Sequence, residues 1–121
     1  MTPFWFLLAL LAAPPGPQSV TDPGARAFQR CAACHSLGAG ASTDAGPSLK
    51  GVYGRRAGAL DGFAYSDAIR AAGRRGLVWN AATLDRYLTD PEAALPGTYM
   101  PYQGGSAAER AAVIDWLRRA D

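Results

Sequence analysis

The segment Cys31-Ala32-Ala33-Cys34-His35 contains both cysteines and the only histidine of the 121-residue chain. Its two thiols are three residues apart, which places them on the same side of a helix end. An imidazole follows immediately. Three side chains with metal-binding or nucleophilic chemistry therefore fall within five residues, and the segment is the first candidate for a functional site.

A CxxCH segment is typical of covalent attachment of haem. Each thiol can add to one of the two vinyl groups of the haem to form a thioether, and the next residue then places an imidazole at the iron. The alternatives are a redox dithiol, half of a zinc site, and a buried CxxC beside an incidental histidine. A zinc site would need further ligands, but the chain has no third cysteine and no second histidine. A thioredoxin-like dithiol would need a βαβ pattern, which the sequence does not show.

Methionine is the other candidate ligand. The chain has two methionines, Met1 and Met100, and Met100 lies in the Pro- and Gly-rich segment 96–101. A lone methionine usually fills a gap in a core, but a loop can also bring a thioether to a metal. We expect His35 and Met100 to be the axial ligands of the haem iron. This arrangement raises the reduction potential of the iron, which suits an electron carrier.

The composition predicts a small domain with few large apolar side chains. Apolar residues make up 49% of the chain, but 25 of them are alanine. From Gln18 onward there are 19 Leu, Ile, Val, Met, Phe or Trp residues, fewer than a single domain of this length normally has. A haem would supply the missing apolar volume.

Start and stop signals predict short helices joined by long loops. Helices are expected from Asp22-Pro23 through Ala32, over 66–72 with a stop at Gly73, from Asn80 to Asp90-Pro91, and over 107–119 after a Ser106/Glu109 capping box. Loops this long in a small domain usually surround something. The predicted fold class is all-α, with three to five short helices and long loops wrapped around one covalently bound haem.

From about Gly24 to Leu117 the chain resembles a class I cytochrome c, of the bacterial type similar to mitochondrial cytochrome c. The resemblance depends on several motifs in order along the chain. They are CAACH, Gly46-Pro47-Ser48-Leu49-x-Gly51-Val52-Tyr53-Gly54-Arg55, Gly62-Phe63-x-Tyr65-Ser66-Asp67-Ala68, Trp79, Thr83-Leu84 with Tyr87-Leu88 and Pro91, and Pro96-Gly97-Thr98-x-Met100.

The resemblance implies roles for further residues. Pro47 matches the residue whose carbonyl accepts a hydrogen bond from the proximal imidazole. Three others, Arg55, Tyr65 and Trp79, match groups that hydrogen-bond a haem propionate. Tyr87 and Thr98 match residues near the methionine sulfur and the other propionate.

The resemblance also implies that the first and last helices cross at a steep angle. Gly24 and Phe28 would meet the Trp116 region at this crossing. Two positions depart from the family pattern. Ile69 stands where an asparagine is usual, which leaves the polar network between Tyr87 and Met100 open, and Tyr99 stands where a lysine usually precedes the axial methionine.

The N-terminal segment indicates export. Residues 4–13 form an apolar run of ten, too short to span a bilayer, and Pro14-Pro15-Gly16-Pro17 follows it. We expect residues 1–17 to be a cleaved secretory signal, although no Lys or Arg precedes the run. Residues 18–121 would then form a single cytochrome c domain in the periplasm. The alternative is a buried N-terminal helix or a start codon assigned too far downstream.

Charge is distributed unevenly along the chain. Eleven of the twelve basic residues are arginine, and Lys50 is the only lysine. Residues 50–75 hold six basic and two acidic side chains, whereas residues 80–100 hold one basic and three acidic. A basic patch could steer encounters with an acidic redox partner, and the alternative is a solvated surface without partner preference.

The sequence therefore predicts a periplasmic one-electron carrier rather than an enzyme. It would be a monomer that carries one haem c on Cys31 and Cys34, exchanges electrons with membrane or periplasmic redox proteins, and binds no nucleic acid. The alternative function is a haem-containing, electron-accepting subunit of a periplasmic dehydrogenase complex.

Overall fold

A computed structural model describes residues 21–37, 41–102 and 105–120. Its helices are α1 (Pro23–Ala32), α2 (Asp67–Arg74), α3 (Ala81–Thr89), α4 (Pro91–Ala94) and α5 (Ala107–Arg119). Within the described residues the only β-type pairing is an isolated antiparallel bridge between Arg56 and Val78. The predicted all-α fold with short helices and long loops is confirmed.

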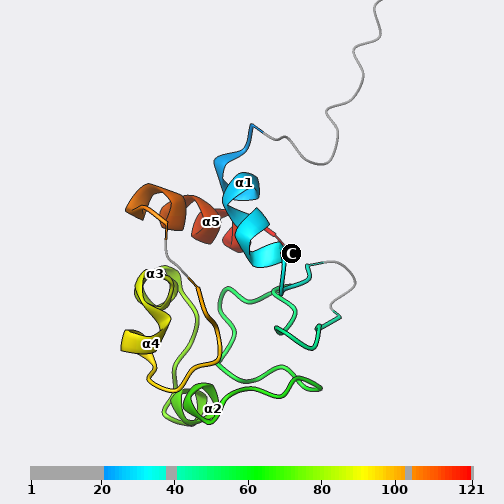
Figure 1. Ribbon diagram of the computed structural model, residues 1–121, viewed down its shortest axis with the longest axis vertical. Helices are drawn as coiled ribbons and strands as arrows, with labels where there is room; N and C mark the ends of the chain where they lie inside the picture. Colours follow the sequence, from blue (N-terminus) through cyan, green and yellow to red (C-terminus); the bar gives the residue numbers. More distant parts are fainter. Residues whose placement is uncertain (1–20, 38–40, 103–104, 121) are drawn as a thin grey trace, which may run out of the picture.

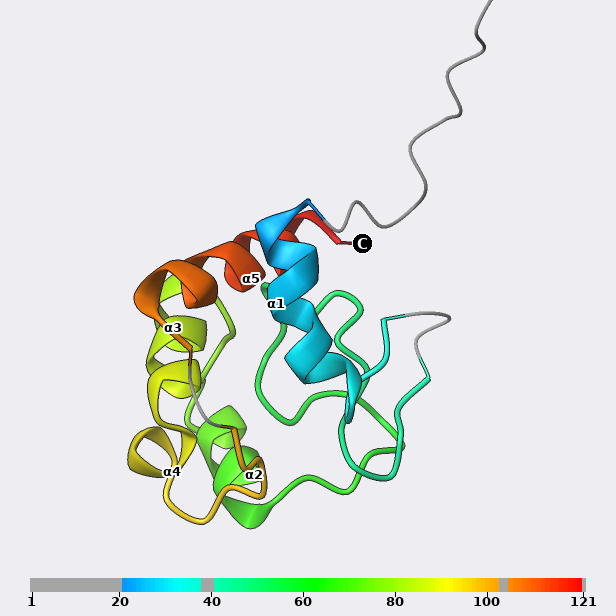
Figure 2. The same cartoon turned by 45° about the horizontal axis from the view of Figure 1, so that its top comes forward.

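The helices surround the loops on one side and at both ends of the molecule. α1 and α5 cross at one end, α2 lies at the other, and α3 and α4 lie between them (Figures 1 and 2). The long connection from α1 to α2 forms the opposite side. The α1–α5 and α3–α5 pairs make the main helix–helix contacts.

Caps are present at the start of the four longer helices, three at predicted positions and one at Ser66, which was expected to be helical. The side chains of Asp22, Ser66, Asn80 and Ser106 each accept a hydrogen bond from a backbone N–H in the first turn. Such a bond satisfies one of the N–H groups that have no partner inside the helix. In the reciprocal capping box of α3, the Thr83 hydroxyl also accepts from the Asn80 N–H at 2.8 Å.

The predicted stop of the second helix at Gly73 is wrong. α2 continues to Arg74, with Gly73 buried inside it, and the chain turns at Gly76, whose φ is +97°. The N–H groups of Gly76 and Leu77 donate to the carbonyls of Gly73 and Ala72, both at 3.0 Å. This is a Schellman motif, which requires a left-handed residue at its corner. Gly73 is needed for another reason, because a Cβ there would lie 3.0 Å from the carbonyl carbon of Ala57.

The α1–α5 crossing depends on the absence of a side chain at Gly24. A Cβ built on Gly24 would overlap Trp116 and lie 2.7 Å from the carbonyl oxygen of Ala112. One turn later in α1, the ring centroids of Phe28 and Trp116 are 4.5 Å apart. The expected contact of Gly24 and Phe28 with the Trp116 region is therefore present.

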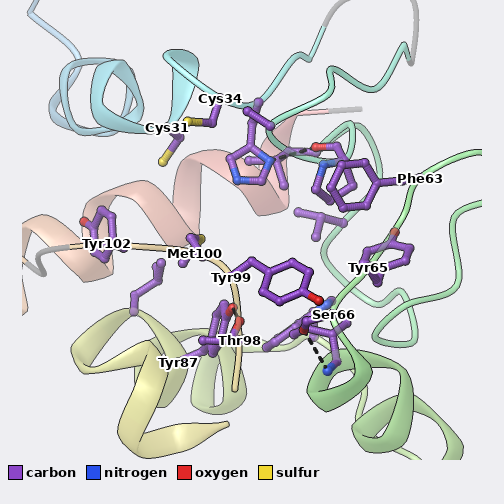
Figure 3. Close-up of a pocket in the computed structure, with 18 of the residues that line it drawn as sticks. Cys31, Cys34, Phe63, Tyr65, Ser66, Tyr87, Thr98, Tyr99, Met100 and Tyr102 are labelled. Carbon is purple, nitrogen blue, oxygen red and sulfur yellow. Dashed lines mark hydrogen bonds between the residues drawn. The ribbon is translucent and has the colours of Figure 1, made fainter. Parts of the chain in front are cut away.

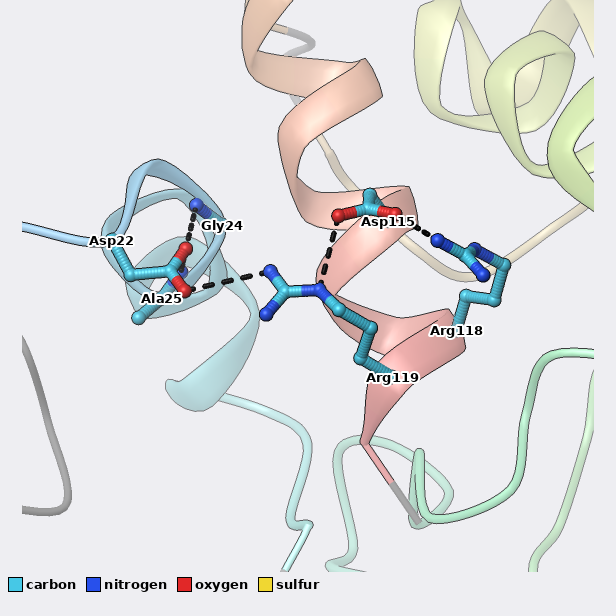
Figure 4. A network of polar contacts seen from close by, with 6 residues as sticks. All are labelled: Asp22, Gly24, Ala25, Asp115, Arg118 and Arg119. Atoms are coloured by element: carbon cyan, nitrogen blue, oxygen red, sulfur yellow. Dashed lines mark hydrogen bonds and ion pairs between the residues drawn. The ribbon is translucent and has the colours of Figure 1, made fainter.

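Polar contacts join the start of α1 to the end of α5 (Figure 4). The Asp22 carboxylate accepts from the Gly24 N–H at 2.8 Å and from Arg119 at 3.4 Å. The hydrogen bond from the Gly24 N–H is the main cause of the lowered pKa of Asp22, and Arg119 lowers this pKa further. In α5, Asp115 pairs with Arg118 and Arg119, and Arg118 is the main cause that lowers the pKa of Asp115. Exposed pairs of this kind contribute little stability, so packing holds the crossing together.

The buried core lies between α5, α3 and the loops. Its buried residues include Val113, Ile114 and Leu117 from α5 and Leu84, Tyr87 and Leu88 from α3. The two helices are also joined by Arg110, whose Nε donates to Asp85 at 2.9 Å and whose guanidinium donates to the carbonyl of Gly105 at 2.9 Å.

Two loop segments are joined beside this core. The N–H of Gly54 donates to the carbonyl of Trp79 at 2.6 Å, and the N–H of Trp79 donates to the carbonyl of Arg55 at 2.9 Å. The N–H of Ala57 donates to the carbonyl of Leu77 at 2.9 Å. These bonds place Arg55 and Trp79 next to each other although 24 residues separate them in the sequence.

The expected signal, residues 1–17, lies outside the described residues. Among the residues that are described, no helix has the length and apolar character needed to cross a bilayer.

We predict that Gly24→Ala lowers the free energy of unfolding of the haem-loaded protein by about 1–3 kcal/mol, the usual cost of overpacking. Thermal or denaturant unfolding measures the change. Gly105→Ala is the control, because a Cβ there meets mainly the side chain of Glu109, which can swing into solvent. Equal stability of Gly24→Ala and the wild type would show that α1 and α5 do not approach as closely as described.

Candidate functional site

A cavity of about 340 Å³ lies between α1, α2, α3, α5 and the loops. Its volume is within the usual range for small-molecule and cofactor sites, roughly 300–1,000 Å³. All ten residues that the sequence nominated line it. They are Cys31, Cys34, His35, Pro47, Arg55, Tyr65, Trp79, Tyr87, Thr98 and Met100. The wall between them is mainly apolar, with Leu49, Val52, Ile69, Leu84, Leu88, Val113 and Leu117.

The lining residues come from segments far apart in the sequence (Figure 3). Cys31 and Cys34 lie at the end of α1 on one side. Met100 approaches on the extended segment that follows α4, and Tyr87 comes from α3. Phe63 and Tyr65, on the loop before α2, close another side, with ring centroids 4.9 Å apart.

The two cysteines are free thiols at the cavity wall. Burial, with a contribution from Cys34, raises the pKa of Cys31 to about 11. A dithiol that exchanges disulfides needs a thiol of lowered pKa, because the thiolate is the nucleophile. The raised pKa of Cys31 therefore disfavours the redox-dithiol alternative.

His35 is fixed by the loop opposite it. Its Nδ1 is 2.8 Å from the carbonyl oxygen of Pro47. A carbonyl can only accept, so Nδ1 carries the proton and Nε2 keeps a free lone pair. Burial lowers the pKa of His35, the field of Arg55 adds to this, and the bond to Pro47 opposes it. The ring is thus neutral, as a histidine metal ligand must be.

Gly46 packs against the same ring. A Cβ at Gly46 would lie 2.7 Å from Cε1 and Nδ1 of His35 and 2.8 Å from the carbonyl oxygen of Cys34. Any side chain at this position would push the ring away from Pro47. Gly46 was part of a sequence motif, but the sequence gave it no role. Its role depends on the contact with His35, which is eleven positions earlier in the chain.

Arg55 brings a positive charge to the cavity wall. Its guanidinium donates to the carbonyls of Ser48 at 2.9 Å and Lys50 at 3.1 Å. Burial lowers the pKa of Arg55, against a smaller opposing effect of Tyr65. A partly desolvated cation favours an anionic group in the cavity. The Tyr65 hydroxyl lies nearby and accepts from the N–H of Leu60 at 3.3 Å.

One polar partner of Tyr87 is Thr98. The hydroxyl groups of Tyr87 and Thr98 are hydrogen-bonded to each other, and the Tyr87 ring lies 5.1 Å from that of Trp79. Burial is the main cause that raises the pKa of Tyr87. Ile69 is buried and lines the cavity with its hydrocarbon side chain. Tyr99, the other departure, is 75% exposed at the edge of the cavity.

Met100 is carried by a segment without regular secondary structure. Gly97 adopts a φ of +93°, its N–H donates to the Glu92 carboxylate, and the Thr98 N–H donates to the carbonyl of Leu95 at 3.0 Å. These bonds turn the chain after α4 so that Met100 reaches the cavity. The prediction that Met100 lies in a loop rather than on an apolar helical stripe is confirmed.

The sequence gave no role to two polar residues beside the cavity. Thr43 makes several hydrogen bonds beside Cys34 and Gly46, and Ser48 is among the most buried residues described. Both are small residues in a loop whose partners are backbone groups, and no local pattern marks such contacts. The zinc alternative gains no support, since the described segments contain no group of three or more His, Cys, Asp or Glu side chains that could hold a metal ion.

The model of the cytochrome c family matches residues 21–121. This chain belongs to the cytochrome c family. The cytochrome c2 of Rhodoblastus acidophilus is 48% identical over 83 residues, which are 69% of this chain and 75% of that protein. The cytochrome c2 iso-2 of Magnetospirillum fulvum is 47% identical over 93 residues, 76% of this chain and 93% of that protein.

Solved structures of the cytochrome c family agree with the fold. The cytochrome c2 of Rhodospirillum centenum matches with a TM-score of 0.76 at 34% identity, over 83% of this chain and 98% of that one. The cytochrome cH of Methylobacterium extorquens matches with a TM-score of 0.71 at 38% identity, over 80% and 95%. The resemblance noted from the sequence is confirmed.

Covalently bound haem c is the cofactor of this family, and the cavity fits it. Cys31 and Cys34 have the spacing of the attachment motif and are free thiols at the wall. The cavity is mainly apolar, as the haem ring requires, and Arg55 supplies a cation for its carboxylates. His35 offers a neutral imidazole with a free Nε2.

We predict that the double variant Cys31→Ser, Cys34→Ser, refolded without haem, loses most of the far-UV helical signal of the haem-loaded wild type. Its core would retain an unfilled cavity, which is destabilising. The single variant Cys31→Ser is the control, because Cys34 can still form one thioether. A haem-free double variant with native helical signal would show that the side chains alone hold the fold.

Proposed function

We propose that this cytochrome c is a periplasmic carrier of single electrons with His35 and Met100 as the axial ligands of its haem. The observation that carries the proposal is that one apolar cavity brings together both attachment cysteines, a neutral imidazole and the only methionine of the described residues. Bound haem c supplies an iron that alternates between the ferric and ferrous states.

His35 would act as the proximal ligand through Nε2. The bond from Nδ1 to the Pro47 carbonyl fixes the orientation of the ring and increases the electron density that Nε2 donates. Gly46 packs against this ring without a side chain that would displace it. These contacts hold the imidazole in one position in both oxidation states, which limits rearrangement during electron transfer.

Met100 would be the second ligand. A thioether is a soft, neutral donor that favours the ferrous state and raises the reduction potential. It would also occupy the iron position at which oxygen or peroxide would otherwise react. The proposal of a carrier that is not an enzyme depends on this bond.

The polar residues of the cavity would bind the two haem propionates. The cavity lining includes Arg55, Tyr65 and Trp79, and also Tyr87 and Thr98, whose hydroxyl groups are hydrogen-bonded to each other. The guanidinium of Arg55 is oriented in advance by the carbonyls of Ser48 and Lys50. A charge-assisted bond from this group would compensate the cost of bringing a carboxylate into a mainly apolar site.

Residues outside the cavity bear on export and on the choice of redox partners. Residues 1–17 would direct secretion and be removed, which leaves 18–121 as the mature domain. The carrier would be a monomer that exchanges electrons with redox proteins in the periplasm or its membranes. Basic residues are concentrated in 50–75, so acidic faces would be the preferred docking surfaces.

We predict that Met100→Ala opens the iron. The oxidised variant should lose the near-infrared charge-transfer band of a sulfur–iron bond, the reduced variant should bind carbon monoxide, and the reduction potential should fall. Tyr99→Phe is the control, since it changes the neighbouring exposed residue and leaves the thioether in place. The assignment fails if the wild type binds carbon monoxide as readily as Met100→Ala, or if the band survives the substitution.

We predict that the native protein appears in periplasmic extracts as a free monomer whose first residue lies between about residues 14 and 20. Cell fractionation, gel filtration and N-terminal sequencing measure this. Co-purification with a large dehydrogenase would instead support the function of an electron-accepting subunit. Recovery of the full-length chain from the cytoplasm would contradict export.

A further inference from the structure

We propose that Thr43 is a positioning residue for His35 and acts through its side-chain hydroxyl. This inference rests on the proposed role of His35 as an axial ligand. Thr43 belongs to the loop between α1 and Pro47, and its side chain does not line the cavity. Its effect on the imidazole is therefore transmitted by backbone groups.

The Thr43 hydroxyl joins the two backbone segments that flank the His35 ring. It donates to the carbonyl oxygen of Cys34 at 2.5 Å, with the Gly46 carbonyl as a more distant acceptor at 3.3 Å. It accepts from the N–H groups of Gly46 at 3.1 Å and Ala45 at 3.2 Å. The Thr43 N–H donates to the carbonyl of Gly46 at 3.0 Å.

These bonds fix the two contacts that hold the ring. Cys34 is the residue before His35, and Gly46 both packs on the ring and precedes Pro47, whose carbonyl accepts from Nδ1. On the other side of His35, the N–H of Leu49 donates to the carbonyl of Ser36 at 2.8 Å. The imidazole therefore lies between two cross-links, and only the one at Thr43 is made by a side chain.

Removing the hydroxyl should loosen one cross-link and leave the other in place. Gly46 and Pro47 would then move more freely relative to Cys34, and the bond from Nδ1 to Pro47 would open more often. A weaker bond makes the imidazole a poorer donor, which disfavours ferric iron and raises the reduction potential. One hydrogen bond of ordinary strength corresponds to about a two- to tenfold change in an opening equilibrium.

The test uses haem-loaded Thr43→Val, which keeps the shape of threonine and lacks the hydroxyl. NMR of the reduced protein measures the solvent exchange of the His35 Nδ1 proton, and voltammetry measures the potential. We expect exchange to be faster by about two- to tenfold and the potential to be more positive. Thr43→Ala should change both in the same direction, and Thr43→Ser should restore the wild-type values.

Thr89→Val is the matched control. Thr89 is also an exposed threonine whose hydroxyl donates to a backbone carbonyl, that of Asp85 at 2.6 Å, but it lies on α3 outside the cavity lining. This variant loses the same kind of bond and should leave the His35 exchange and the potential unchanged.

Three results would overturn the inference. The first is wild-type exchange and potential in Thr43→Val. The second is the same change in Thr43→Ser or Thr89→Val. The third is failure of both Thr43→Val and Thr43→Ala to retain haem while Thr43→Ser matures, since Thr43 would then hold the fold rather than the ring. Failure of the proposed function is a separate outcome, seen in the wild type if the His35 ring protons lack the ring-current shift of a haem ligand.

Discussion

The structure depends on an apolar cavity at its centre that the protein's own side chains do not fill. Four helices, α1, α2, α3 and α5, and the loops between them border this space, and the walls are made of residues such as Leu84, Val113 and Leu117 that a compact domain would normally pack against one another. Haem c, the cofactor of the family, supplies the missing apolar volume. Gly24 at the α1–α5 crossing and Gly73 next to Ala57 let neighbouring segments approach closely, so that the helices and loops pack around the cavity.

Within this frame, the electron-transfer chemistry is set by few contacts. The Pro47 carbonyl accepts a hydrogen bond from the His35 ring, the Gly46 backbone packs on that ring, and the Thr43 hydroxyl bonds to Gly46 and to the Cys34 carbonyl. Arg55 is held by the carbonyls of Ser48 and Lys50, and its charge suits a carboxylate. The attachment cysteines and His35 come from one segment, whereas Met100 and the proposed propionate partners come from other parts of the chain. Backbone hydrogen bonds fix the turns that carry His35 and Met100.

The sequence predicted much of this arrangement because its main signals are local. Proline at the first helical position, the cap residues and the CxxCH spacing act within a few residues. The proline and the caps gave the starts of α1, α3 and α5 correctly. The end of α2 was predicted wrongly at Gly73, since a glycine needed for close approach to Ala57 has the same appearance as one that ends a helix. Thr43 and the role of Gly46 could not be predicted, because their partners lie across a loop and no periodicity marks them. The hydrogen bond between Tyr87 and Thr98 could not be predicted either, because the sequence shows only that Ile69 replaces the usual asparagine.

The most direct test of the account is X-ray absorption at the iron edge of the purified, haem-loaded protein. His35 and Met100 as axial ligands predict a first shell with one thioether sulfur and one imidazole nitrogen in addition to the four nitrogens of the haem ring. The sulfur should be present in both the ferric and the ferrous protein. A first shell without sulfur, or with two imidazole nitrogens, would contradict the account.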